Sequence, residues 1–152
     1  MANSVFGLKG VIATKSAVQS IASGVAGVSV NFDVETFDTS GDTEKVKFHS
    51  IVATADENAK FYAVEDGFYE LSANVKFAVV ASGRVGLGYS IDTGATVLVI
   101  EQPGGAASEP GLLLRKLLKL SAGQYVTLKA YQSSGAAVNI VVAGTEVVFK
   151  KM

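Results

Sequence analysis

The segment 66–79 starts with a turn and then alternates apolar and polar side chains, and this period of two constrains the fold more than any other feature of the chain. The apolar side chains share one set of alternate positions: Tyr69, Leu71, Ala73, Val75, Phe77 and Val79. The positions between them are polar: Glu70, Ser72, Asn74 and Lys76. Successive side chains of a β-strand point to opposite faces of a sheet, so the pattern predicts a strand with one face against a core. Segment 120–131 repeats the pattern after a Gly turn and predicts a second such strand.

Strand-like segments recur along the chain and are separated by turns rich in Gly, Ser and Asp. We expect strands over residues 5–14, 28–36, 45–53, 60–64, 67–80, 84–91, 97–101, 112–120, 124–131, 138–142 and 146–150. Turn signals lie between them at 38–42, 81–83, 92–94 and 133–135. Short strands at this spacing predict an all-β protein, either a sandwich or a barrel.

Segment 111–120, with the sequence GLLLRKLLKL, is the place where two interpretations compete. Leu, Lys and Arg favour helices, and the Lys–Leu pattern is also typical of helices that lie on membrane surfaces. The segment is short, however, and its neighbours on both sides are predicted strands. As a strand it places four apolar side chains on one face: Leu112, Leu114, Leu118 and Leu120. We therefore predict a strand over 112–120.

Composition indicates one domain with outward faces that are buried against other molecules. A chain of 152 residues can bury a core without a metal or disulfides, and this chain has no cysteine. It is 49% hydrophobic and 18% charged, which favours association with further subunits. The net charge is −1 and Lys and Arg are scattered, so we expect no nucleic-acid partner.

Targeting and membrane signals are missing from the sequence. No charged and then apolar stretch of the secretory type opens it, and no apolar run approaches the length of a membrane-spanning helix. We therefore expect no membrane association and a protein that folds in a bacterial-type cytoplasm.

The sequence offers no residue set for nucleophilic catalysis or for a histidine metal site. His49 is the single histidine, and no Gly-x-Ser-x-Gly motif accompanies it. It lies in an alternating segment, where we expect a solvated strand histidine. Gly86 and Gly88 lie within a predicted strand and do not open a helix, so they are no dinucleotide fingerprint; we expect them to allow close approach of a strand or subunit.

Two groups of carboxylates are the remaining candidates for a metal site. One group comprises Asp38, Asp42 and Glu44, and the other Asp56 and Glu57. Neither has the spacing of a recognised calcium loop, so we expect ordinary turn chemistry at both. The sequence thus predicts a protein that is no enzyme and has no cofactor.

Two phrases of the sequence resemble the motifs of a known family. Gly67, Tyr69 and Leu71 stand where that family has a Gly-x-Tyr-x-Phe-like strand, and 120–124 matches its Leu-x-x-Gly-Asp turn with Gln124 in place of Asp. The family comprises the jelly-roll domains of tumour necrosis factor and of the complement q globular head. The resemblance covers roughly residues 31–151, and it implies an antiparallel jelly-roll β-sandwich that assembles as a homotrimer.

The same resemblance implies that residues of one sheet meet at a threefold axis. By position, the trimer-interface candidates are Ser72, Leu113, Leu117 and Val148. We expect residues 28–152 to form the jelly-roll domain and residues 1–27 to form an N-terminal arm and the first strand. The partner-binding candidates in this arm are Val5, Phe6, Leu8 and Lys9.

Three roles are compatible with a domain of this family. The first is a structural virion protein, a trimeric phage decoration (cement) protein that binds the major capsid protein or another virion protein on the capsid exterior. The second is a phage tail- or head-fibre tip that binds a host receptor, and the third is a secreted complement q-like binding module. The absence of cysteines, of glycosylation sequons and of an export signal favours a phage product made in the host cytoplasm and located in the virion. The polar loop 101–111 is a further candidate contact.

Overall fold

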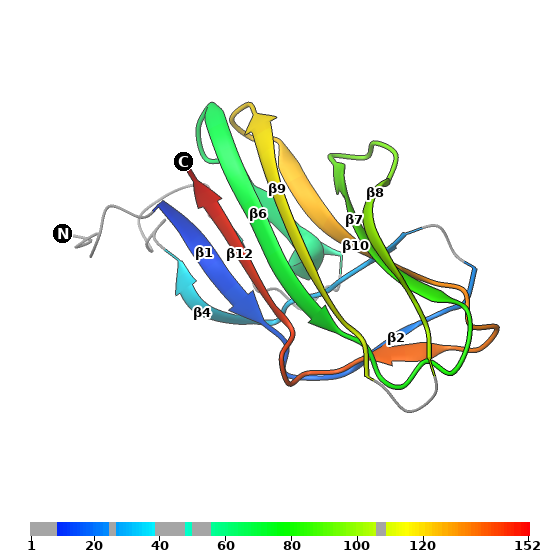
Figure 1. Cartoon of the computed structure of the whole chain (residues 1–152). Coiled ribbons are helices and arrows are strands. Elements are labelled where there is room, and N and C mark those ends of the chain that lie inside the picture. The colour runs from blue at the N-terminus through cyan, green and yellow to red at the C-terminus, as the bar shows by residue number, and fades with distance from the viewer. Residues whose placement is uncertain (1–8, 25–26, 39–47, 50–55, 106–108) are drawn as a thin grey trace.

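The computed structural model describes residues 9–24, 27–38, 48–49, 56–105 and 109–152, and nearly all of their regular secondary structure is β-strand (Figure 1). The strands are β1 (Lys9–Thr14), β2 (Gln19–Ile21), β3 (Val28–Ser29), β4 (Val34–Asp38), β5 (Lys60–Tyr62), β6 (Gly67–Lys76), β7 (Arg84–Ile91), β8 (Val97–Pro103), β9 (Gly111–Leu120), β10 (Tyr125–Gln132), β11 (Val138–Ile140) and β12 (Glu146–Lys151). A short 3-10 helix, η1 (Glu57–Ala59), precedes β5. No helix among the described residues is long and apolar enough to cross a membrane. The predicted all-β class is confirmed.

Two antiparallel sheets pack face to face as a jelly-roll sandwich (Figure 1). The first sheet has the strand order β4-β1-β12-β6-β9. The second sheet has the order β3-β10-β7-β8, and β5 also pairs with β10. A separate pair, β2 with β11, lies at one end of the sandwich (Figure 1). Residues 9–24 therefore supply strands to the first sheet and to this pair.

An aromatic cluster joins the two sheets in the core. Phe149 of β12 stacks on Tyr69 of β6, with ring centroids 5.0 Å apart. Across the sandwich Phe149 meets Phe61 of β5 at 5.9 Å, and Phe61 meets Phe32 at 5.8 Å. All four side chains are fully buried. Aromatic side chains bury more apolar area than other residues, so this cluster is a principal source of the sandwich's stability.

The ambiguous segment GLLLRKLLKL is the strand β9, as predicted. It pairs with β6 along its full length, from Leu120 opposite Gly67 to Gly111 opposite Lys76. The side chains that point into the core are buried: Leu112, Leu114, Leu118 and Leu120. Cross-strand pairing and burial of this apolar set outweigh the helix propensity of Leu and Lys, which is worth only a few tenths of a kcal/mol for each residue.

The strand predicted over 67–80 ends earlier than the alternation indicated. β6 stops at Lys76, because its partner β9 begins at the opposing Gly111. The next backbone groups turn away: the amide of Phe77 donates to Pro110, and that of Ala78 donates to Asn139 beside β11. Val79 is consequently exposed, so its predicted burial is wrong.

The strand predicted over 28–36 is divided between the two sheets. β3 pairs with β10 in the second sheet, whereas β4 pairs with β1 in the first. Val30 and Phe32 occupy the crossing and are fully buried. The segment predicted as one strand therefore crosses the core from the second sheet to the first. β2 was not predicted, and of the strand predicted over 45–53 only residues 48–49 lie within the described residues.

Gly88 on β7 illustrates a close approach between strands. A Cβ atom at this position would lie 2.3 Å from the carbonyl oxygen of Val97 on β8. The pairing of β7 with β8 also shifts register between Leu87 and Gly88. The predicted role of this glycine in close strand approach is confirmed, because any side chain would push β8 away.

Candidate functional site

Several large apolar side chains on the outward surface of the first sheet are exposed in the single chain. Leu113 and Leu117 of β9 are 65% and 56% exposed, and Phe68 of β6 is also exposed. At the opposite edge, Phe37 of β4 is exposed beside Ile12 of β1. Large apolar patches of this kind mark surfaces that other molecules cover. We call this surface the apolar face; it comprises Ile12, Val34, Phe37, Phe68, Leu113, Leu117 and Val148.

All four predicted trimer-interface residues lie on the outward surface of the first sheet, and Leu113, Leu117 and Val148 belong to the apolar face. Ser72 stands opposite Val148 on one side and opposite Arg115 on the other. Leu113 and Leu117 flank Arg115 on the outward side of β9. The strand register thus brings together residues that are far apart in the sequence. That they contact a neighbouring protomer stays a prediction, which is developed under the proposed function.

A charged cluster lies in the middle of the apolar face. Glu70 is only 8% exposed, although its strand position points outward. Its Oε2 atom accepts hydrogen bonds from Nε and Nη2 of Arg115 at 2.9 and 2.6 Å, and its Oε1 atom lies 3.4 Å from Nζ of Lys150. The hydrogen bonds from Arg115 hold the pKa of the Glu70 carboxyl below its usual range, and Lys150 adds to this effect. Sequence analysis did not single out Glu70, because Arg115 and Lys150 are distant from it in the sequence and meet it only through the pairing of β6 with β9 and β12.

The edge of the second sheet is apolar as well. β8 is its last strand, and three consecutive side chains on it are exposed: Val97, Leu98 and Val99. Consecutive residues of a strand face opposite sides, so neither side of this strand is fully covered. An uncovered apolar edge strand invites association with another chain. We call these three residues the β8 edge.

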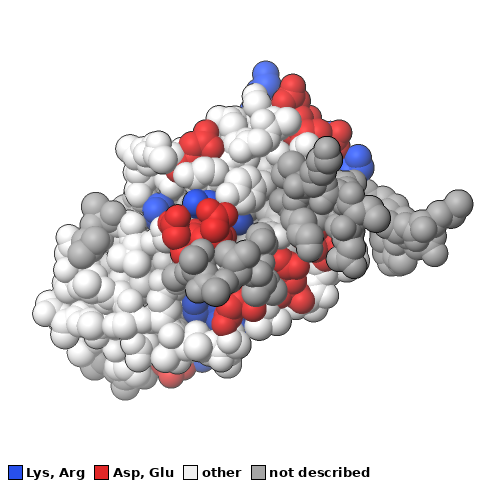
Figure 2. Space-filling model, turned by 180° about the vertical axis from the view of Figure 1, so that it is seen from behind, with Lys and Arg blue, Asp and Glu red and all other residues white. Residues whose placement is uncertain are grey.

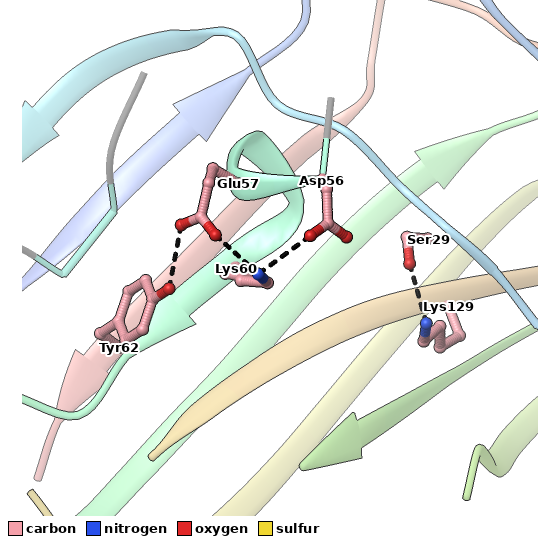
Figure 3. A network of polar contacts seen from close by, with 6 residues as sticks. All are labelled: Ser29, Asp56, Glu57, Lys60, Tyr62 and Lys129. Atoms are coloured by element: carbon pink, nitrogen blue, oxygen red, sulfur yellow. Dashed lines mark hydrogen bonds and ion pairs between the residues drawn. The ribbon is translucent and has the colours of Figure 1, made fainter. Parts of the chain in front are cut away.

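The outward surface of the second sheet has a different chemistry, and we call it the polar face (Figure 3). Nζ of Lys60 bonds Oδ2 of Asp56 at 3.0 Å and Oε1 of Glu57 at 2.6 Å, and it lies 5.1 Å from the ring centre of Tyr125. The hydroxyl of Tyr62 donates to Oε2 of Glu57 at 3.0 Å. Asp56 and Glu57, which were candidates for a metal site or for turn chemistry, therefore hold a lysine.

The pKa values on the polar face follow from these contacts. Hydrogen bonds to Glu57 and Asp56 raise the pKa of Lys60 above its ordinary value. The same bond from Lys60, together with that from Tyr62, lowers the pKa of Glu57. Burial and the neighbouring Glu57 raise the pKa of Tyr62. Each shift favours the charged pair and the neutral phenol, so the arrangement is a stable network and no poised acid or base.

Charge is distributed without a basic surface on this side of the molecule. In the view from behind, acidic and basic side chains are interspersed, and a broad part of the face is uncharged (Figure 2). Nearby on the polar face, Nζ of Lys129 donates to the hydroxyl of Ser29 at 2.8 Å (Figure 3). Among the described residues, no group of three or more His, Asp and Glu side chains is arranged to hold a metal ion.

His49 is buried, so its predicted solvated position is wrong. Its side chain is fully inaccessible and stacks on Phe61 at 4.8 Å. Nε2 lies 2.9 Å from the carbonyl oxygen of Asn58, and Nδ1 lies 3.0 Å from Oε1 of Glu35. These polar partners satisfy the ring inside the core. They come from β4 and η1, which local alternation around position 49 could not reveal.

The predicted partner-binding arm is described only at its last residue. Val5, Phe6 and Leu8 lie outside the described residues. Lys9 begins β1, is exposed, and pairs with Glu65 at 3.0 Å. The loop predicted over 101–111 begins later than expected, because β8 continues to Pro103.

Comparisons with known proteins support the fold. No protein-family model matches the sequence, and no curated protein matches it. Murine APRIL at pH 8.5 is similar, with a TM-score of 0.64 and 14% identity over 95% of this chain and 99% of that one. The structure at pH 8.0 gives 0.63 and 15% over the same shares. The Eiger TNF from S. frugiperda gives 0.63 and 10%, over 95% of this chain and 92% of that one. Identities this low show the fold alone, which is a tumour necrosis factor-like jelly roll, as the sequence resemblance implied.

Proposed function

We propose that this protein is a non-catalytic structural protein that assembles as a homotrimer and decorates a phage capsid. The observation that supports assembly most strongly is the apolar face. Its leucines and phenylalanine are exposed in one chain, and burying a side chain of this kind is worth about 1.5–3 kcal/mol. The sequence resemblance implies the same assembly.

A cyclic trimer needs two different surfaces on each chain. In a ring of three, the contact is heterologous, so one patch of each protomer meets another patch of the next. The described residues include two exposed apolar patches, the apolar face and the β8 edge, and they lie on different sheets. We infer that the β8 edge of one protomer covers part of the apolar face of its neighbour, and this contact closes the ring.

The Glu70 cluster would orient this contact. Glu70 is already neutralised inside its own chain by Arg115 and Lys150, so its burial requires no charge from the partner. Arg115 uses two of its five N–H groups on Glu70, and its side chain is 70% exposed. The other N–H groups can donate to acceptors of a neighbour, which fixes the relative orientation of the two chains.

In the proposed decoration of a capsid, a compact trimer would use its N-terminal residues as the contact. A trimer presents three equal contacts at a threefold position of a lattice, and linked weak contacts reinforce one another through effective concentration. The arm residues Val5, Phe6, Leu8 and Lys9 are the proposed gripping element. The partner is the major capsid protein or another virion protein, and the location is the virion. The fibre-tip and secreted-module roles are the alternatives that the tests below distinguish.

Assembly is tested by sedimentation velocity. We expect the unmodified protein to sediment as a trimer and the Leu113→Asp protein as a monomer, because a carboxylate would replace an apolar side chain at the contact and would lose its hydration there. Ala137→Asp, on an exposed turn before β11, is the control and should remain trimeric. A monomeric unmodified protein would refute the trimer.

Decoration is tested by mixing the trimer with undecorated capsids of tailed phages and pelleting the capsids. We expect the trimer to sediment with them, and a variant lacking residues 1–8, which leaves β1 whole, to stay in the supernatant. Full binding by the shortened protein would remove the arm from the proposal. If a correctly formed trimer bound no capsid but adhered to host cells, the fibre-tip role would replace decoration.

A further inference from the structure

Two adjacent hollows lie at the end of the sandwich where β1 ends and β12 begins, away from the C-terminus (Figure 1). The first has a volume of about 260 Å³, and its walls include Lys15, Val18, Gln19, Asn31, Asp33 and Asn58. The second, of about 350 Å³, is bordered by Thr14, Lys15, Asn74, Thr145 and Glu146. Lys15 is common to both. The first hollow lies outside the proposed trimer contact, whereas the second borders the apolar face at Thr14 and Asn74.

Lys15 is the fixed centre of the first hollow. It is only 6% exposed, and its ammonium group donates to the backbone oxygen of Asn31 at 2.5 Å and to Oε1 of Gln19 at 3.1 Å. Burial lowers the pKa of Lys15, and the charge of Asp33 opposes this effect. A third N–H of the ammonium group is not engaged by these two acceptors. The hollow therefore has a rigid, pre-oriented donor at its base.

The other walls are held in place by the same network. Gln19 accepts a hydrogen bond from the Asn31 amide at 3.0 Å and donates to the Ser29 carbonyl at 2.7 Å. Asp33 accepts from the amide of Ser16 at 2.7 Å and from its hydroxyl. Side chains locked in this way lose little entropy when a ligand binds, so even a small site can retain affinity.

The chemistry of the walls selects an uncharged, hydroxyl-rich ligand. The Gln19 amide has both a donor and an acceptor, the Asp33 carboxylate accepts and the Lys15 ammonium group donates, which suits neighbouring hydroxyl groups. Each hollow pairs Lys15 with one acidic group, Asp33 in the first and Glu146 in the second, so neither an anion nor a cation finds an excess of opposite charge. Val18 is exposed at the wall and offers an apolar surface for the C–H side of a sugar ring.

We propose that the hollow around Lys15 is a carbohydrate-binding site for a neutral sugar, with Asp33, Gln19 and Lys15 as its polar contacts and Val18 as its apolar contact. The volumes admit one ring in each hollow, so a monosaccharide or disaccharide unit at the end of a glycan is the ligand class. Lys15, Asp33 and Val18 are outside the apolar face and the β8 edge, and the site does not depend on the proposed trimer. It would give a virion surface protein an attachment to glycans of a cell surface.

The test is a titration of the ¹⁵N-labelled protein, followed by amide chemical shifts. The probes are glucose, galactose, mannose and N-acetylglucosamine, with inorganic phosphate and tetramethylammonium as charged counterparts. We expect one of the sugars to shift the amides of Lys15, Val18 and Gln19 in a saturable way, with a dissociation constant on the order of 1 mM. The charged counterparts should leave these amides unchanged.

Two variants decide whether the observed binding belongs to this site. Asp33→Asn and Val18→Asp should each weaken the sugar by at least tenfold, and Lys129→Ala on the polar face should not. Val18 is exposed, so its variant tests the site even if Asp33→Asn perturbs the fold. No saturable shift with any sugar would overturn the proposal. So would binding that both variants retain, or a stronger response to phosphate or to the quaternary ammonium ion. A monomeric protein that still binds the sugar would refute the trimer and leave this site intact.

Discussion

The outward surfaces of the two sheets differ in how far one chain completes their interactions. On the polar face, Lys60 already has two carboxylates and an aromatic ring, and Lys129 has the Ser29 hydroxyl. On the apolar face, Leu113 and Leu117 have no comparable cover, and their exposed area is available to a partner. The two sheets of the sandwich thus differ in how many of their outward side chains have partners within the chain. The polar surface is complete in one chain, and the other keeps exposed apolar area that the proposed assembly would cover.

The largest expected effect is on the stability of the trimer, when a charge is placed on the apolar face. The same kind of change on the polar face is the comparison. Leu117→Asp or Val148→Asp on the apolar face should raise the concentration at which the trimer dissociates by at least about 100-fold, which corresponds to ~5.5 kcal/mol per trimer because the dissociation constant varies with the square of this concentration. Lys129→Asp on the polar face should leave that concentration within a factor of about two. Analytical ultracentrifugation over a dilution series gives both values. Equal effects on the two surfaces would contradict the assignment of the interface.

A second comparison removes one carboxylate from each surface. Glu70→Gln leaves Arg115 and Lys150 without their buried anion, and we expect a loss of about 1–3 kcal/mol in the free energy of unfolding. Glu57→Gln weakens an ion pair that solvent screens, because more than a third of the Glu57 side chain is exposed, and it should cost at most about 1 kcal/mol. Urea unfolding at neutral pH measures both. If Glu57→Gln lowered the free energy of unfolding more than Glu70→Gln did, the stabilising role of the Glu70 cluster would be contradicted.

The pH dependence of the free energy of unfolding should show a larger contribution from Glu70 than from Glu57. The folded-state pKa of Glu70 is depressed, so its contribution is present above the unfolded value of about 4.3 and is lost as the pH falls through the folded value. Glu70→Gln should therefore flatten the decline of stability between neutral pH and about pH 3. Glu57→Gln should flatten it less, because solvent screens its pair with Lys60. Urea midpoints at several pH values give the two slopes, and identical slopes would count against the role of Glu70.

The smallest effect on stability is expected at the hydrogen bond between Lys129 and the neutral hydroxyl of Ser29 on the polar face. Ser29→Ala removes one half-exposed hydrogen bond to Lys129 and should change the free energy of unfolding by no more than about 0.5 kcal/mol. Thermal unfolding of the variant and of the unmodified protein tests this value. A large loss would mean that the polar face depends on β3 more than its contacts indicate.

The period of two made much of the sandwich predictable from the sequence. β6, β7, β9 and β10 lie where alternation placed them, within one to four residues at each end. The outward positions of β9 also followed from parity, and the family resemblance then singled out Leu113 and Leu117 among them. Local pattern succeeds here because each of these strands is long and has one face in the core.

Contacts between distant segments could not be predicted in the same way. The partners of His49 come from Glu35 and Asn58, and the partners of Glu70 come from Arg115 and Lys150. Each pairing depends on strand order, which alternation within a strand does not encode. The hollow around Lys15 is of this kind too, since Asn31 and Asn58 approach it only after the chain has changed sheets at Phe32.

The position of β12 has a consequence for the time course of folding. This strand lies between β1 and β6, so the first sheet closes only when segments near opposite ends of the described chain have met. Pairings of such long sequence separation are slow to form, and all-β domains rich in them fold in milliseconds to seconds. The apolar face is built across this same junction, with Val148 between Ser72 and Ile12. A partly folded chain therefore does not yet have the surface with which it would associate, and self-recognition is delayed until the sandwich has closed.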